Sequence, residues 1–246
     1  ILMARLHDED FFRLKKYIES YSLAGAIESK IREQSIKRAH KYTLGALQIL
    51  IILESFSAKK NLKLNGIEIK ADSIAHHQIS ECFSDLTNSF FAELHGLHKP
   101  AMMALRSAIE TFVRGVAGSH SDEALTTKNV NRLFEIAKLL KPFTGKSAKY
   151  FESLRSNYGV LCDYTHSYSP AHMMKNHAIA NFPKYDTSSL KKWLAVYTGM
   201  VASVLAIIIY SNKLIYNKAG AKAQDVLDEV IPKDVRMFAL GAPSQN

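Results

Sequence analysis

The chain has 246 residues, of which 47% are hydrophobic and 22% charged, with 11 Gly and 6 Pro. This composition supports a substantial apolar core and excludes a disordered, collagen-like or low-complexity protein. Two cysteines exclude a disulfide framework and a paired CxxC zinc site, so a reducing compartment, the cytoplasm, is expected. The formal net charge of +9 favours anionic partners, or is simply the charge of a soluble, lysine-rich helical surface.

The first quarter of the chain predicts two helices. An acidic turn precedes a short apolar-periodic stretch that ends near Ser20. Ser22 is a suitable N-cap for one long helix over 23–58, or for two nearly collinear helices over the same range. The second half of this helix is apolar on nearly every side and is expected to be buried, whereas its charged first half is expected to project. That first half carries the candidate nucleic-acid-binding residues Lys30, Arg32, Lys37, Arg38 and Lys41.

An Asn-Gly pair at 65–66 divides a stretch in which apolar and polar residues alternate, which predicts a small β-hairpin over 62–69. Asp72 or Ser73 is expected to cap the helix that follows. Apolar spacing of three and four predicts that this helix runs to a stop at 96 and that another runs over 99–118. Two further helices are predicted over 128–140 and 146–167, separated by Pro142 and Gly145.

A loop over 166–188 is longer than a plain connection requires, which is typical of functional or mobile loops. Ser188 and Ser189 are expected to cap a last long helix over 190–216. Its centre, residues 194–210, has no charged residue. Seventeen residues are few for a membrane span, so a buried bundle helix is favoured over membrane anchoring.

These elements predict an all-α, multi-helix bundle with a small β-hairpin insertion. We expect four segments in order: an N-terminal helical region (1–59), a hairpin linker (60–72), the main bundle (73–217), and short C-terminal helices with a tail (218–246).

Charged residues that could carry chemistry follow one face of the helix over 99–118. Arg106, Glu110 and Arg114 lie at positions i, i+4 and i+8. They either form intrahelical ion pairs on a solvated face, or Arg106 reaches across to a histidine or an anion on a neighbouring helix.

A second constellation lies at the end of the helix over 146–167, where Asp163 and Cys162 share helix faces with His166. A metal site would need more donors, and only His172 and His177 are nearby, so neither a metal nor a cofactor is expected. Cys162 lies close to the apolar stripe, which favours inert packing over nucleophilic catalysis.

Two motifs about fifty residues apart suggest a family. AMMALRSAIETF (101–112) contains an LRxxxE element, and YGVLCDYTHSYSP (158–170) contains a YxxLxxxxH element. The pair resembles uncharacterised bacterial helical proteins that are similar to the HEPN superfamily, and the resemblance covers about 73–216. It implies a HEPN-like helical bundle, a homodimer, and a role in bacterial toxin or antiviral defence systems, many of whose HEPN members are metal-independent ribonucleases.

The active members of that superfamily carry an Arg-x(4–6)-His motif, which is absent before His166 because 159–161 hold Gly, Val and Leu. One match lies elsewhere, from Arg114 to His120, a spacing that a chain with 10 His produces readily by chance. Arg155 is eleven residues before His166, about 16 Å along a helix, and does not supply the missing arginine. The arginine must therefore come from another helix or another subunit, and Arg106 is the candidate.

If the two helices are antiparallel, Arg106, Glu110, Asp163 and His166 form one polar cluster. The cluster is then either a buried network that holds the packing or an active site. In the active-site interpretation His166 is the general acid/base, Arg106 stabilises phosphate charge, and Asp163 or Glu110 orients the imidazole. The alternatives are a non-catalytic binding or scaffold module for RNA, another nucleic acid or a partner protein, and a membrane-anchored protein.

Overall fold

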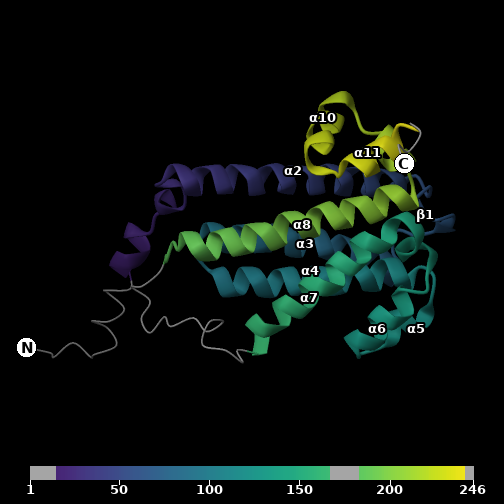
Figure 1. The fold of residues 1–246 in the computed structure, drawn as a ribbon, viewed down its shortest axis with the longest axis horizontal. Helices are drawn as coiled ribbons and strands as arrows, with labels where there is room; N and C mark the ends of the chain where they lie inside the picture. Colours follow the sequence, from purple (N-terminus) through teal and green to yellow (C-terminus); the bar gives the residue numbers. More distant parts are fainter. Residues whose placement is uncertain (1–14, 167–182, 242–246) are drawn as a thin grey trace, which may run out of the picture.

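The computed structural model describes residues 15–166 and 183–241. Within these residues the chain is an all-α bundle with one small hairpin, which confirms the predicted fold class (Figure 1). Four long helices run roughly along the long axis, and a fifth, α7, crosses them obliquely. These helices are α2 (Lys30–Ala58), α3 (Ile74–Leu94), α4 (His98–Gly118), α8 (Thr187–Ser211) and α7 (Ala148–His166).

The start of the long basic helix differs from the prediction. A single 3₁₀ turn (Ala24–Ile27) comes first, and α2 begins at Lys30 because the side chain of Ser29, not that of Ser22, accepts a hydrogen bond from the backbone N–H of Arg32. The first half of α2 does not simply project. Ala39 is fully buried, so this half of α2 already packs on the bundle.

The last long helix also begins earlier than predicted. The Asp186 carboxylate accepts a hydrogen bond from the backbone N–H of Ser189 at 2.7 Å and caps α8. The helix ends at Ser211, and the separate turn α9 (Leu214–Asn217) follows. α8 is long and apolar enough to span a membrane, but 67% of its most apolar window is buried inside the bundle. It serves as the central core helix of the described structure.

The predicted hairpin is confirmed. Strands β1 (Lys63–Leu64) and β2 (Ile67–Glu68) pair in antiparallel register. Asn65 and Gly66 have φ angles of 49° and 87°, the left-handed values that a two-residue type I′ turn requires. The Asn65 N–H donates to the carbonyl of Ser211 at 2.9 Å, so the hairpin closes the end of α8.

The middle of the chain contains more short elements than the sequence predicted. The helix α5 (Asp122–Thr126) was not expected, and α6 covers only Val130–Ala137. The gap around Pro142 and Gly145 holds two 3₁₀ turns, Lys141–Phe143 and Gly145–Ser147. At the other end of the chain, α10 (Ala221–Val230) and α11 (Lys233–Ala239) lie beside α2 and α8 (Figure 1).

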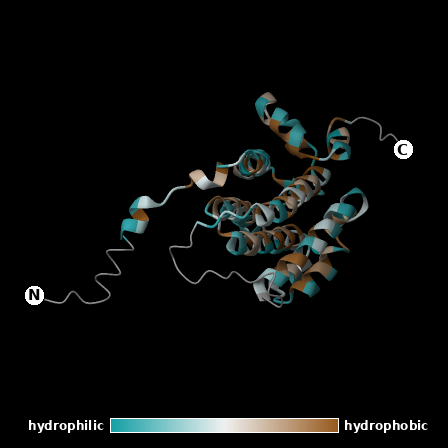
Figure 2. Cartoon of the chain, turned by 60° about the vertical axis from the view of Figure 1, so that its left-hand side comes forward, coloured by the Kyte–Doolittle hydropathy of each residue, from teal (hydrophilic) through white to brown (hydrophobic). Residues whose placement is uncertain are grey.

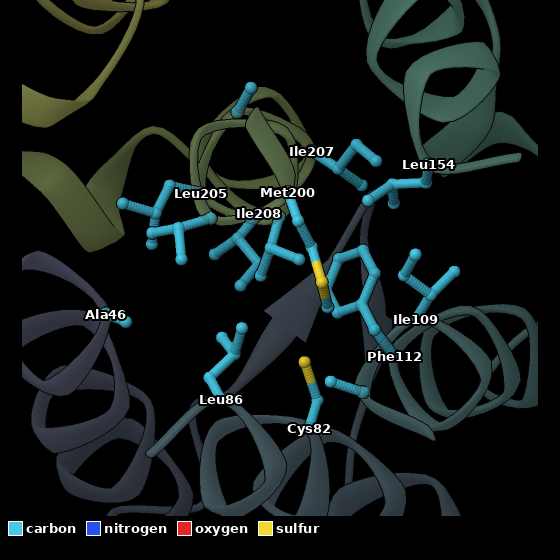
Figure 3. Close-up of a cluster of buried hydrophobic side chains, with 14 of the residues drawn as sticks. Ala46, Cys82, Leu86, Ile109, Phe112, Leu154, Met200, Leu205, Ile207 and Ile208 are labelled. Carbon is cyan, nitrogen blue, oxygen red and sulfur yellow. The ribbon is translucent and has the colours of Figure 1, made fainter. Parts of the chain in front are cut away.

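The core is continuous from α2 to α11, and the apolar residues of the bundle helices gather toward its interior (Figure 2). α3 and α4 form the closest pair, because Gly115 lets the backbone of α3 approach α4 directly. In the close-up of the core, Cys82 of α3, Phe112 of α4 and Met200 of α8 converge (Figure 3). The expected segment boundaries remain a prediction, since residues from several segments share this core.

One buried hydrogen-bond chain joins three helices. The indole N–H of Trp193 on α8 donates to Ser89 Oγ on α3 at 2.9 Å, and Ser89 Oγ donates to the carbonyl of Ala101 on α4 at 2.8 Å. Trp193 and Ser89 are fully buried, so these bonds satisfy polar atoms that water does not reach.

The C-terminal helices are tied to the bundle by Asp234 of α11. Its carboxylate accepts hydrogen bonds from Tyr150 of α7 at 2.7 Å and Tyr210 of α8 at 2.8 Å, and it pairs with Lys149 at 2.9 Å. Burial opposes ionisation, but these three donors lower the pKa of Asp234 to about 2. The carboxylate therefore holds α7, α8 and α11 together as an anion.

Candidate functional site

Arg106, the candidate arginine of the sequence analysis, lies at the interface between α4 and α7, which we call the seam. The Nη2 group of Arg106 donates a hydrogen bond to the Tyr158 hydroxyl at 2.6 Å, and its guanidinium carbon lies 4.9 Å from the centre of the Tyr158 ring. His98 is the first residue of α4 and lies two turns before Arg106. Its ring contacts the ring of Tyr164 edge-on, and Tyr164 lies later on α7 than Tyr158. The contacts therefore run in opposite directions along the two helices, which makes α4 and α7 antiparallel, as the candidate site requires.

Arg106 remains a cation in this half-buried position. Burial disfavours the charged form, but a hydrogen bond with Cys162 and the nearby Tyr158 and Glu110 outweigh it, so the pKa of Arg106 is raised. Burial is also the main cause that raises the pKa of Tyr158 to about 12. The tyrosine is thus a neutral hydroxyl beside a fixed positive charge at neutral pH.

Helix register relates Arg106 to His166. Tyr158 and Cys162, the two α7 partners of Arg106, are four residues apart and so share one face of the helix. His166 is the next residue in this series and the last residue of α7. Its backbone position lies one helical turn beyond Cys162, about 6 Å along the axis. The side chain of His166 lies outside the described residues.

The other two members of the expected cluster have different surroundings. Glu110 forms an ion pair with Arg114 at 3.0 Å on the same helix, the intrahelical pair that was the alternative interpretation. Asp163 is exposed. The polar cluster that the described residues form is therefore Arg106, Tyr158 and Cys162, with the Glu110 charge nearby.

The alternative pair, Arg114 and His120, has structural partners. Besides its ion pair, the Arg114 guanidinium donates to the carbonyls of Ala124 at 3.1 Å and Thr127 at 2.6 Å. These bonds fasten α5 to α4. His120 Nδ1 lies 2.8 Å from the Ser119 hydroxyl, and burial lowers the pKa of the ring. The contacts of Arg114 and His120 hold the turn after α4, and a catalytic role for this pair remains a prediction.

A histidine and carboxylate pair escaped the sequence analysis. Glu93 at the end of α3 and His98 at the start of α4 lie on opposite sides of a tight turn, and Nδ1 of His98 is 3.2 Å from Oε2 of Glu93. Their side chains are only 5% and 15% exposed, in the order Glu93 and His98. In the sequence, a Glu and a His lie on either side of Gly96. This pattern is typical of an ordinary helix end followed by a new helix, so it did not indicate a contact between the two side chains.

The basic stretch at the start of α2 contains cations with structural partners and cations that are exposed. Arg32 donates to the carbonyl of Gly25 and pairs with Glu28 at 3.5 Å, so it holds the turn before α2. Lys41 pairs with Glu229 of α10 at 2.8 Å. The three other predicted residues, Lys30, Lys37 and Arg38, are exposed.

A groove between α2 and α8 collects part of this charge. Its volume is about 540 Å³. Arg38 and Tyr42 line it from α2, and Lys191 lines it from the second turn of α8. Its other lining residues are small or apolar residues of α8: Leu194, Ala195, Thr198, Gly199 and Ala202. Arg38, one of the predicted nucleic-acid-binding residues, therefore shares this groove with Lys191 of α8, which the sequence analysis did not include. The binding role of the basic residues of α2 remains a prediction.

Among the described residues, no group of three His, Cys, Asp or Glu side chains could hold a metal ion. His172 and His177, the additional donors considered from the sequence, lie outside these residues.

Comparison with known proteins does not identify the chain: no protein-family model, no curated protein and no solved structure matches it.

Proposed function

We propose that the protein is a HEPN-like, metal-independent endoribonuclease of a bacterial toxin or defence system, acting as a homodimer. The observation that carries the proposal is the contact of Arg106 with Tyr158 and Cys162. It holds a permanent positive charge against the side of α7 on which residues 158, 162 and 166 follow one another at a spacing of four. His166 follows Cys162 by one turn of α7, and an arginine with a nearby histidine can act together on one phosphodiester. The resemblance of the two motifs supplies the reaction class.

The reaction needs no metal. His166 takes the proton from the ribose 2′-OH or delivers a proton to the leaving 5′-oxygen, and solvent exchanges the other proton. The 2′-oxygen bonds to phosphorus while the bond from phosphorus to the 5′-oxygen breaks. The products are a 2′,3′-cyclic phosphate and a 5′-hydroxyl. Arg106 stabilises the charge that develops on the phosphate oxygens, and Tyr158 holds the guanidinium in place before substrate binds.

Glu110 and Asp163 have lesser roles in this mechanism. The Glu110 charge helps keep Arg106 protonated. Asp163 is a candidate for orienting His166, since the two residues are three apart on one helix.

The test compares cleavage of a labelled single-stranded RNA in EDTA by the wild type and by the Arg106→Lys and His166→Gln variants. Loss of a general acid/base typically costs about 10²- to 10⁴-fold, so His166→Gln should lose at least about 100-fold. Arg106→Lys keeps the charge but loses the planar donor pair, and we expect a smaller loss. Arg155→Ala is the control, because Arg155 is an exposed arginine of the same helix and forms an ion pair with Glu135 at 3.0 Å.

Circular dichroism must show that each variant is folded. Equal cleavage by all four proteins, or no cleavage by the folded wild type, would refute the ribonuclease.

A non-catalytic nucleic-acid-binding module is the second candidate function, and the groove between α2 and α8 is the observation that favours it. Retained RNA binding without cleavage in the same assay would select it.

A further inference from the structure

We infer that the groove between α2 and α8 binds single-stranded RNA, with Arg38 and Lys191 on the phosphates and Tyr42 against a base. The inference rests on the proposed function for the choice of RNA, and it assigns the substrate-binding surface to helices other than those of the α4 and α7 seam.

Charge is the first argument. Arg38 and Lys191 are both exposed, they come from different helices, and both line the same groove. No carboxylate is among the described residues that line it. The nearest acidic residue along α8, Asp186, is already engaged as the N-cap of that helix. Two cations in a concave site whose described lining holds no carboxylate attract an anion, and a phosphodiester is the anion that Arg and Lys bind in RNA.

Shape is the second argument. Ala195, Gly199 and Ala202 recur on one face of α8 and form a floor without bulky side chains. A Cβ added to Gly199 would meet nothing closer than the Asn157 amide nitrogen at 4.0 Å. The volume of about 540 Å³ falls within the usual range of ligand pockets, about 300 to 1,000 Å³.

The side chains that line the groove also include an aromatic ring, that of Tyr42. Tyr42 is half-buried, so its ring is held against the bundle while it lines the groove. Single-strand-binding sites combine a basic groove with an aromatic ring on which a base stacks, and this groove holds both. The Thr198 hydroxyl donates to the carbonyl of Leu194 at 2.9 Å, so it does not compete for the strand.

The experiment measures binding of a fluorescein-labelled, twelve-nucleotide single-stranded RNA by anisotropy at several salt concentrations. All proteins carry His166→Gln so that cleavage does not consume the RNA. The double variant Arg38→Ala/Lys191→Ala should bind at least about tenfold more weakly and lower the slope of log K against log salt by about 1.4, or about 0.7 for each lost phosphate contact.

Two further variants separate the groove from overall charge. Lys218→Ala/Lys222→Ala removes two exposed lysines from the region around α10 and should change binding less than about twofold. Gly199→Leu fills the groove without changing charge, so it should weaken binding while leaving the salt slope intact. If Lys218→Ala/Lys222→Ala weakened binding as much as Arg38→Ala/Lys191→Ala, the inference would be overturned. Unchanged binding by Arg38→Ala/Lys191→Ala would also overturn it.

Binding of anionic vesicles of phosphatidylglycerol and phosphatidylcholine, in place of RNA, would also overturn it. So would saturation by inorganic phosphate with no affinity for the RNA strand. The same experiments distinguish a wrong groove assignment from a wrong ribonuclease assignment. RNA binding that depends on the groove without any cleavage refutes only the ribonuclease, and cleavage with unchanged binding by the groove variants refutes only the groove.

Discussion

Gly115 on α4 lies where two helices touch through their backbones. A Cβ built at this position would be 2.8 Å from the carbonyl oxygen of Ala75 and 2.9 Å from the backbone nitrogen of Ile79, both on α3. Backbone atoms cannot rotate away, so Gly115→Ala must push α3 and α4 apart. Overpacking of this kind costs about 1 to 3 kcal/mol, and the better helix propensity of alanine offsets about 1 kcal/mol. We therefore expect a net loss of up to about 2 kcal/mol, and no stabilisation.

Gly159 of α7 is the matched control, because a Cβ there would meet none of the described residues within 4 Å. Gly159→Ala should therefore stabilise the protein by about 0.5 to 1 kcal/mol through helix propensity alone. Thermal and urea unfolding followed by circular dichroism give both values, and a chain of this size shifts by about 2 to 4 °C per kcal/mol. If both substitutions stabilised the protein equally, the direct contact of α3 with α4 would be refuted.

Two other predictions concern polar contacts. Ser89→Ala leaves the buried indole N–H of Trp193 without an acceptor and should lower the free energy of unfolding, measured in urea, by about 1 to 3 kcal/mol. The loss should be smaller in a Trp193→Phe background. An equal loss in both backgrounds would contradict the hydrogen-bond chain. Asp234 has a folded pKa of about 2, below its unfolded value of about 3.9, so its stabilisation is present above about pH 4 and lost as the pH falls toward 2. Since this carboxylate is 44% exposed, Asp234→Asn should cost only about 1 kcal/mol at pH 7, and a difference from the wild type that persists undiminished at pH 2 would refute this contribution.

The sequence predicted the fold class because helical periodicity and turn residues are local signals. The Asn-Gly pair at 65–66 specified the hairpin through the backbone conformation it requires. Helix starts were less certain, since several serines compete as caps, and the structure selects Ser29 over Ser22. α5 was missed because five residues are too few to show a period.

The candidate site was only partly predictable. Helix spacing identified Arg106, but its partners depend on how α4 and α7 are rotated about their axes, and the structure selects Tyr158 and Cys162 over Asp163. The pair of Glu93 and His98 forms across a turn that has no distinctive spacing. The groove between α2 and α8 joins residues more than 150 positions apart, which no local pattern connects.

The central claim is that the α4 and α7 seam cleaves RNA without a metal through Arg106 and His166. The most direct measurement is end-group analysis of RNA incubated in EDTA with the folded wild type and with His166→Gln. The account predicts 2′,3′-cyclic phosphate and 5′-hydroxyl ends from the wild type, formed at least about 100-fold more slowly by the variant. Intact RNA from both proteins, or the same ends formed at the same rate by both, would contradict it.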